Sequence, residues 1–289
     1  METVISENNL QLLETEFFCQ KKTIAKVKDA QDNRLILKTG GVEPFQIQLL
    51  ETAKLIESQL CFKVPAIVKQ GEGWILLEEI EGQSLNDFYG KKPNWCVEVS
   101  KKISDSYQLV IQEVQKTQSF GNLLSDGQGW LFSRLNLWSK PIVDAGLMRF
   151  PLVQQLENEL EEVIARKGKD FFGWFHGNVI GDHIIISGGD IYLVDLNAVP
   201  RAGRGYHDFL RALDFMFLKA ENEKKMFASI SKWMKQYLSE FDETEVRLVF
   251  SFRNIGILGW DILHHNVEYT VGDLEAKKQL MVKFIKREY

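Results

Sequence analysis

Residues 174–199 read WFHGNVIGDHIIISGGDIYLVDLNAV, and they carry the clearest structural signal in the chain. Two apolar runs, HIIIS and IYLVD, flank the turn residues GGD, which is the pattern of a β-hairpin. The second run ends in Asp195, and a polar loop with His176 and Asn178 lies about seventeen residues earlier. A strand end that fixes one carboxylate and a preceding loop of polar side chains can together face a metal-bound phosphate.

The first ninety residues predict a small α+β lobe. Two β-rich runs within residues 15–38 flank the polar turn KDAQDN, and two more runs flank the GEG turn at residues 71–73. Between these pairs of strands, apolar residues at roughly helical spacing follow Pro44, which favours a helix that begins there. A further helix is expected after Ser84, a possible N-cap. Strands, one helix and then strands again indicate an antiparallel sheet.

The remainder of the chain is expected to be mostly helical. The helical pattern extends over about 92–172 and is interrupted by the glycine-rich stretch at 121–130. After the hairpin, helical spacing returns beyond residue 205, and residues 223–241 form the best amphipathic example.

Composition limits the class of protein. The 289 residues include 40 acidic and 35 basic side chains, a net charge of -5 that argues against a nucleic-acid partner. The three cysteines are far apart in the sequence, without metal-binding spacing, and fit a reducing compartment. The chain has no apolar run near the 18 or so residues of a membrane span and no signal-peptide pattern. We therefore expect a cytoplasmic protein without a membrane partner.

Several motifs in order resemble one family. HGNVIGDHII resembles the catalytic loop of the aminoglycoside phosphotransferase and choline kinase-like family, which has a protein-kinase-like fold. YLVDLNAV is similar to its metal-binding strand end, and GYHDFLRALD to a later helix start that carries an aspartate. Upstream, RLILKTG, LLETAKLIESQL and WILLEEIEGQSL are similar to its lysine strand, glutamate helix and adenine-binding hinge. The resemblance extends from about residue 15 to 217.

The resemblance implies a nucleotide site that uses ATP and Mg²⁺. Lys38 would hold the α- and β-phosphates and Glu51 would pair with Lys38, whereas Asp195 would bind the metal ion. At the hinge, the backbone of Glu79 and Ile80 would meet adenine. Lys38 and Asp195 must then converge, although more than 150 residues separate them.

The resemblance also assigns roles around the catalytic loop. His176 and Gly177 would shape the loop, with the His176 imidazole satisfied by backbone groups. Asp208 would accept hydrogen bonds from the loop backbone, or it would act as a helix N-cap. Asn197 would either add a weak metal ligand or form an Asx turn.

Three positions depart from the family pattern. Asn178 stands where the family has its catalytic aspartate, and an amide cannot accept the proton of an attacking hydroxyl. His183 stands at the metal-binding asparagine, although Mg²⁺ prefers oxygen ligands. The preceding Asp182 would hold the His183 ring or replace the missing carboxylate, or it is a solvated loop residue. The first hairpin, around Gln20 and Lys22, contains no glycine to approach a triphosphate.

From the sequence we expect a bilobal protein-kinase-like fold of the α+β class. The N-lobe would comprise residues 1–81 and bind the nucleotide, and residues 82–289 would form a helical C-lobe with the substrate pocket. The predicted function is ATP-dependent phosphorylation of a hydroxyl on a small molecule, with Asn178 orienting the acceptor and His183 assisting the metal. The alternative is a catalytically impaired pseudokinase that acts as a nucleotide-binding or interaction module.

Overall fold

The computed structural model describes residues 1–18, 22–219, 232, 236, 239 and 241–265. The chain divides into two compact units. Unit 1 comprises residues 1–87, 105–118 and 181–197, and unit 2 comprises the other described residues. The domain boundary expected at residue 81 stays a prediction.

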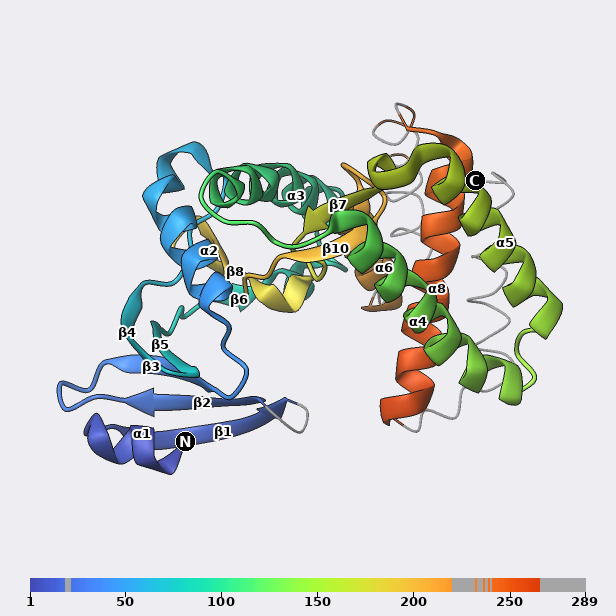
Figure 1. Ribbon diagram of the computed structural model, residues 1–289. Coiled ribbons are helices and arrows are strands. Elements are labelled where there is room, and N and C mark those ends of the chain that lie inside the picture. Colours follow the sequence, from blue (N-terminus) through green and yellow to red (C-terminus); the bar gives the residue numbers. More distant parts are fainter. Residues whose placement is uncertain (19–21, 220–231, 233–235, 237–238, 240, 266–289) are drawn as a thin grey trace. The chain divides into compact units, whose positions relative to one another are not determined.

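The sheet of unit 1 has five antiparallel strands in the order β1-β2-β3-β5-β4 (Figure 1). Its strands are β1 (Gln11–Phe18), β2 (Lys22–Lys28), β3 (Arg34–Thr39), β4 (Ile67–Gly71) and β5 (Trp74–Glu78). The antiparallel sheet predicted from the sequence is therefore confirmed. The glycine-free turn between β1 and β2 includes residues 19–21, which lie outside the described part of the chain.

The turn between β2 and β3 is built by the polar KDAQDN stretch, as predicted. One Asp29 carboxylate oxygen accepts hydrogen bonds from the backbone N–H groups of Gln31 and Asn33, both at 2.9 Å. Asp32 has φ +63°, a left-handed conformation that Asp tolerates better than most residues. These local bonds fix the register in which β2 pairs with β3.

Helices cover the sheet with apolar side chains. Helix α1 (Glu2–Glu7), labelled in Figure 1, was not predicted from the sequence. Its Val4 and Ile5 pack against a buried cluster that includes Val27, Leu37 and Leu76. Burial of one such side chain stabilises the fold by about 1.5–3 kcal/mol.

Helix α2 (Pro44–Leu55) begins at Pro44, as predicted, because Glu43 and Gln46 form a capping box. Residues Leu49, Leu50 and Ala53 make its buried face.

A second, three-stranded sheet of unit 1 has the order β6-β8-β9. Its strands are β6 (Gln83–Ser84), β8 (Ile184–Ser187) and β9 (Asp190–Leu193), and the predicted hairpin β8–β9 is confirmed. Gly188 and Gly189 form its turn, with φ +58° and +93°. After Ser84, only the 3-10 turn η2 (Leu85–Phe88) replaces the expected helix.

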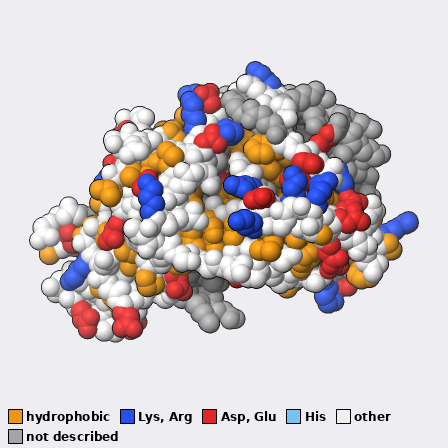
Figure 2. Space-filling view, turned by 45° about the horizontal axis from the view of Figure 1, so that its top comes forward, with side chains coloured by type: hydrophobic (Ala, Val, Ile, Leu, Met, Phe, Trp, Pro, Cys, Tyr) orange, Lys and Arg blue, Asp and Glu red, His pale blue; other side chains and the backbone are white. Residues whose placement is uncertain are grey.

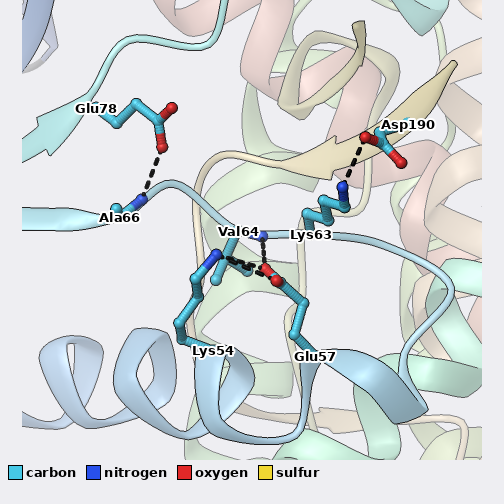
Figure 3. Close-up of polar contacts among 7 residues, drawn as sticks. All are labelled: Lys54, Glu57, Lys63, Val64, Ala66, Glu78 and Asp190. Carbon is cyan, nitrogen blue, oxygen red and sulfur yellow. Dashed lines mark hydrogen bonds and ion pairs between the residues drawn. The ribbon is translucent and has the colours of Figure 1, made fainter. Parts of the chain in front are cut away.

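Strand β9 is tied to the segment that follows α2 and η1 (Glu57–Gln59). The backbone of Lys63 donates to Ile191 O at 2.7 Å and accepts from Leu193 N at 2.9 Å. The Lys63 ammonium also pairs with Asp190 at 2.6 Å, as Figure 3 shows. In the same view, Glu57 accepts hydrogen bonds from Lys54 and from the backbone of Val64. These contacts fix the β8–β9 hairpin within unit 1.

Unit 2 is mainly helical, as predicted for this part of the chain. Helices α4 and α8 lie side by side (Figure 1), and Trp138 of α4 packs on Gly256 of α8, where a Cβ would lie 2.7 Å from the indole ring. The helices are α4 (Leu123–Asp144), α5 (Phe150–Lys167), α6 (His207–Lys219) and α8 (Glu243–His265), and α3 (Pro93–Gln115) continues from unit 2 into unit 1. A two-stranded sheet joins β7 (Phe172–Phe175) to β10 (Val199–Ala202), and the short 3-10 turns are η3 (Gly168–Phe171) and η4 (Gly181–His183).

The glycine-rich stretch at 121–130 does not interrupt the helices where the sequence predicted. Helix α4 begins within it, because the Asn122 side chain accepts hydrogen bonds from the N–H groups of Leu124 and Ser125. Gly127 lies inside this helix, and a Cβ there would lie 2.5 Å from the ring of Phe172. Close packing therefore explains a glycine that the local pattern assigned to a loop.

Two further features concern the exterior. Lys and Arg side chains gather on part of the face displayed in Figure 2, among apolar and acidic side chains.

Among the helices that the structure describes, none combines the length and the apolar character of a membrane span. Most of the amphipathic helix predicted at 223–241 falls outside the described residues.

Candidate functional site

Lys38 on β3 and Asp195 after β9 form an ion pair in unit 1. The Lys38 ammonium lies 2.8 Å from Asp195 Oδ1 and 3.4 Å from the carbonyl oxygen of Val194, across a sequence separation of 157 residues. The two side chains are 21% and 45% exposed, so the pair stays accessible to solvent. The convergence that the sequence analysis required is therefore observed.

The backbone around Asp195 is held on both sides. Val194 N donates to His183 O at 3.0 Å, which continues the β8–β9 pairing beyond the hairpin. Two residues after Asp195, the Tyr107 hydroxyl donates to Asn197 O at 2.5 Å and accepts from Asn197 N at 3.1 Å. The fully buried Tyr107 stacks on Phe62, so this anchor is rigid. Sequence reasoning missed Tyr107, which lies far from any motif.

Glu51 does not form the expected ion pair with Lys38. Helix α2 turns Leu49, Leu50 and Ala53 inward, and at about 100° per residue this leaves Glu51 on the exposed face. The Lys38 ammonium contacts Asp195 instead. A role of Glu51 in nucleotide binding stays a prediction.

Two apolar side chains lie beside Lys38 on its face of the sheet. Ile24 is the direct cross-strand partner of Lys38, and Ile36 lies two residues before it on the same face of β3. Both isoleucines are partly exposed, and Lys26 lies opposite Ile36. Apolar side chains beside a cation suit a purine ring next to its phosphates, and the sequence analysis did not single out either isoleucine.

The hinge residues Glu79 and Ile80 follow β5. Arg34 holds Glu79 in an ion pair at 2.8 Å and Glu81 in a second pair at 3.3 Å. The preceding Glu78 is bound to Ala66 through backbone and side chain (Figure 3). The backbone N–H and C=O of Ile80 form no hydrogen bond with any described residue. They are suited to the adenine edge, and that role stays a prediction.

The segment expected to be the catalytic loop lies in unit 2, between β7 and η4. The buried Asp208 of α6 accepts hydrogen bonds from His176 N at 3.0 Å and Gly177 N at 2.7 Å, as expected. The buried His176 ring accepts from Asn178 N through Nδ1 at 3.3 Å, so backbone satisfies it, also as expected. Burial raises the pKa of Asp208 to about 6, although the two backbone donors oppose that change.

No protein-family model and no curated protein matches the sequence. Solved structures match nearly the whole chain. A choline kinase from Cryptosporidium parvum Iowa II has a TM-score of 0.54 at 14% identity, over 99% of this chain and 94% of its own. The protein has a protein-kinase-like fold.

Two other solved structures support that assignment of the kinase-like fold. Choline kinase LicA from Streptococcus pneumoniae has a TM-score of 0.51 at 16% identity, over 99% of both chains. The amicoumacin kinase hAmiN, in complex with AMP-PNP and Ca²⁺, has a TM-score of 0.51 at 12% identity, over 99% of this chain and 93% of its own. At such identities the likeness establishes the fold, and function has to be argued from the residues.

The metal ligands expected in a kinase-like fold are only partly assembled. Within the described part of the chain, no three His, Cys, Asp or Glu side chains are grouped closely enough to hold a metal ion. Mg²⁺ commonly uses one or two carboxylates together with substrate phosphates and water. Asp195 therefore fits a metal that arrives with a nucleotide. The imidazole of the partly buried His183 is a poorer ligand for Mg²⁺, and its role stays a prediction.

Asp182, next to His183, is engaged by a neighbour. Its exposed carboxylate accepts a hydrogen bond from Asn86 Nδ2. The adjacent Gly181 carbonyl accepts from the Ser84 hydroxyl at 2.9 Å. These contacts anchor η4 to the segment that follows the hinge.

Asn178 lies at the position where the sequence analysis expected the catalytic residue. Its Oδ1 accepts a hydrogen bond from Arg211 Nε at 3.1 Å. This bond fixes the orientation of the amide group. The arrangement can orient an acceptor, but it cannot remove a proton.

Proposed function

We propose that the protein is an ATP-dependent phosphotransferase that acts on a hydroxyl group of a small molecule. The observation that carries this proposal is the 2.8 Å contact between Lys38 and Asp195, which distant segments bring together. A cation on a rigid strand beside a carboxylate suits a triphosphate and its divalent ion.

The Lys38–Asp195 pair would be exchanged for nucleotide contacts. In the nucleotide complex Lys38 would contact phosphate oxygens, and Asp195 would turn its carboxylate to Mg²⁺. The metal ion would neutralise phosphate charge during transfer. Because an exposed ion pair contributes only about 0–1 kcal/mol, its opening costs little. Ile24, Ile36 and the Ile80 backbone would hold the adenine.

The chemical step transfers the γ-phosphoryl group. The acceptor oxygen forms a bond to γ-phosphorus, the bond to the β–γ bridging oxygen breaks, and ADP leaves with that electron pair. The hydroxyl proton passes to water or to the transferred phosphate, because the Asn178 amide cannot accept it. Such a reaction depends mainly on positioning and charge neutralisation, so it tolerates a missing base at reduced rate.

Several solved structures with a similar fold support this assignment. They include choline kinases and an amicoumacin kinase complexed with AMP-PNP and Ca²⁺. The scattered cysteines favour a cytoplasmic location.

A thermal-shift titration with ATP tests the first step. We expect Mg²⁺-dependent stabilisation of the wild type by ATP, and loss of that shift in Lys38→Ala and Asp195→Ala. Lys54→Ala is the matched control, because Lys54 lies in the last turn of α2 and pairs with Glu57 at 2.9 Å. An equal loss in Lys54→Ala, or an unchanged shift in Lys38→Ala, would contradict the assignment. Transfer of labelled phosphate from ATP to hydroxyl compounds then tests the reaction.

The second candidate is a pseudokinase that binds nucleotide without transferring phosphate. The contact of Asn178 with Arg211 favours it, since the catalytic position holds an amide whose oxygen is occupied. ATP-dependent stabilisation without transfer, in the wild type and in Asn178→Asp, would decide for the pseudokinase.

A further inference from the structure

Arg201 on β10 has one edge of its guanidinium group without a partner. Its Nη1 donates to Pro200 O at 2.8 Å, and the group stacks on Trp130, with 3.6 Å from Cζ to the ring centroid. Nε is buried and finds no acceptor among the described residues, whereas the hydrogen bond to Pro200 uses Nη1 and leaves Nη2 beside Nε on the other edge. A buried donor without an acceptor costs about 1–3 kcal/mol, so the arrangement needs an explanation.

The unsatisfied edge faces the catalytic loop. A Cβ on Gly177 would lie 3.5 Å from Arg201 Nε and 3.7 Å from Nη2. Because residue 177 is glycine, Val199 and Arg201 can both approach the loop backbone closely. The next residue, Asn178, is held by Arg211. Arg201 therefore presents two adjacent donors beside the residue proposed to orient the acceptor hydroxyl.

The surroundings of Arg201 are positively charged. Arg253 of α8 and Arg134 of α4 are near enough to disfavour its charge, and the buried Asp208 is the carboxylate that opposes them. Burial and these cations lower the pKa of the Arg201 guanidinium. The pKa of the fully buried His207 is likewise lowered, by burial and by the charges of Arg253, Arg201 and Arg211. A negative ligand would relieve both groups.

A guanidinium edge of Nε and Nη2 matches the two oxygens of a carboxylate or phosphate. Resting on the function proposed above, we propose that Arg201, in the field of Arg134 and Arg253, binds an anionic group of the acceptor. The substrate is thus a hydroxyl compound that carries a carboxylate or phosphate, and cationic amino alcohols are disfavoured. A quaternary ammonium group would be repelled by the three arginines, and the buried Asp208 offsets them only in part.

Anion binding is tested without nucleotide. We would measure the melting temperature of the full chain in sodium sulfate and in sodium chloride of equal ionic strength, at millimolar concentrations. Sulfate should raise the melting temperature of the wild type by a few degrees more than that of Arg201→Gln. Only the wild type has the guanidinium edge of Nε and Nη2 that can bind two sulfate oxygens. Lys38→Ala should keep the sulfate shift, which separates this site from the nucleotide phosphates. A shift that survives in Arg201→Gln, or disappears in Lys38→Ala alone, overturns the inference.

Arg204→Gln is the matched control, since Arg204 is exposed and pairs with Asp170 at 2.7 Å. It should retain the sulfate shift. Arg134→Gln removes a positive charge near Arg201 together with the contact of Arg134 with the Trp138 ring, and it should weaken the shift without removing it. If Arg201→Gln does not fold, Arg134→Gln decides, because an unweakened shift there contradicts the proposed field.

A transfer assay tests the substrate class. Labelled ATP is offered with glycerate and glycerol 3-phosphate, and in parallel with glycerol and ethanolamine. Transfer to the anionic members, with KM raised at least tenfold in Arg201→Gln and kcat less affected, supports the inference. Transfer only to ethanolamine or glycerol overturns it and leaves the phosphotransferase assignment intact. Absence of all transfer counts against the activity, and the sulfate experiment still decides whether Arg201 binds anions.

Discussion

The hydroxyl of Tyr107 holds both backbone groups of Asn197, two residues beyond Asp195. It donates to the carbonyl oxygen at 2.5 Å and accepts from the N–H at 3.1 Å. Helix α3 therefore fixes the segment that carries the proposed metal-binding carboxylate. The contact lies wholly within unit 1.

Tyr107→Phe should destabilise the protein and weaken Mg²⁺-dependent ATP binding. Loss of the hydroxyl removes two hydrogen bonds to the backbone of Asn197, at a cost of about 1–3 kcal/mol. At about 2–4 °C per kcal/mol, the melting temperature should fall by several degrees. The KM for ATP should rise several-fold, because Asp195 loses its fixed position.

Tyr206→Phe is the control for that experiment. The Tyr206 hydroxyl is buried and has no hydrogen-bond partner among the described residues. Its removal should leave the melting temperature unchanged or slightly raised. Equal destabilisation by both changes would refute the anchoring role of Tyr107.

Asp208 should make stability decrease as pH rises from about 4 to 6. Burial raises its pKa to about 6, above the value of about 3.9 in an unfolded chain. The folded state then binds the proton more tightly, so this contribution is complete below pH 4 and lost as pH passes 6. Urea unfolding of wild type and Asp208→Asn at pH 4–7.5 measures the difference. The free energy of unfolding of the wild type, relative to Asp208→Asn, should fall as pH rises. A relative free energy that grows with pH would mean that the backbone donors of His176 and Gly177 outweigh burial and lower the pKa of Asp208.

Asn178→Asp should accelerate phosphate transfer. A carboxylate at this position can accept the hydroxyl proton, and general-base catalysis typically contributes about 10²- to 10⁴-fold. Arg211, which donates to Asn178, would keep the new carboxylate ionised. The measurement is kcat with labelled ATP, with Asn178→Ala as the slower comparison. A wild type that is already as fast as Asn178→Asp would show that a base is unnecessary here.

Gly177→Ala should destabilise the catalytic loop more than Gly188→Ala destabilises the hairpin. Both glycines have positive φ, +78° and +58°. A Cβ at residue 177 would clash with Val199, whereas at residue 188 it meets nothing within 4 Å. We expect about 1 kcal/mol for the backbone strain alone and about 2–3 kcal/mol more at Gly177. Chemical denaturation measures both, and equal losses would exclude the steric contribution.

Much of the secondary structure was predictable from the sequence because local physics governs it. The strands β2, β3, β8 and β9 follow alternating or apolar runs between turn residues, and helix α2 begins at a proline. The order of these motifs also identified Lys38 and Asp195 as candidates. Helix α4 was misjudged at its start, since Gly127 owes its place to the packing of Phe172 and not to a turn.

The sequence by itself determined the elements, their order and the chemical types available at each motif. Only the tertiary structure decided which groups meet: Lys38 pairs with Asp195 and not with Glu51, and Tyr107 anchors Asn197. Likewise, Arg134 of α4 and Arg253 of α8 lie near enough to Arg201 of β10 to lower its pKa. Their spacing in the chain carries no periodic signal, because contacts between distant segments depend on the packing of whole elements and not on local propensity.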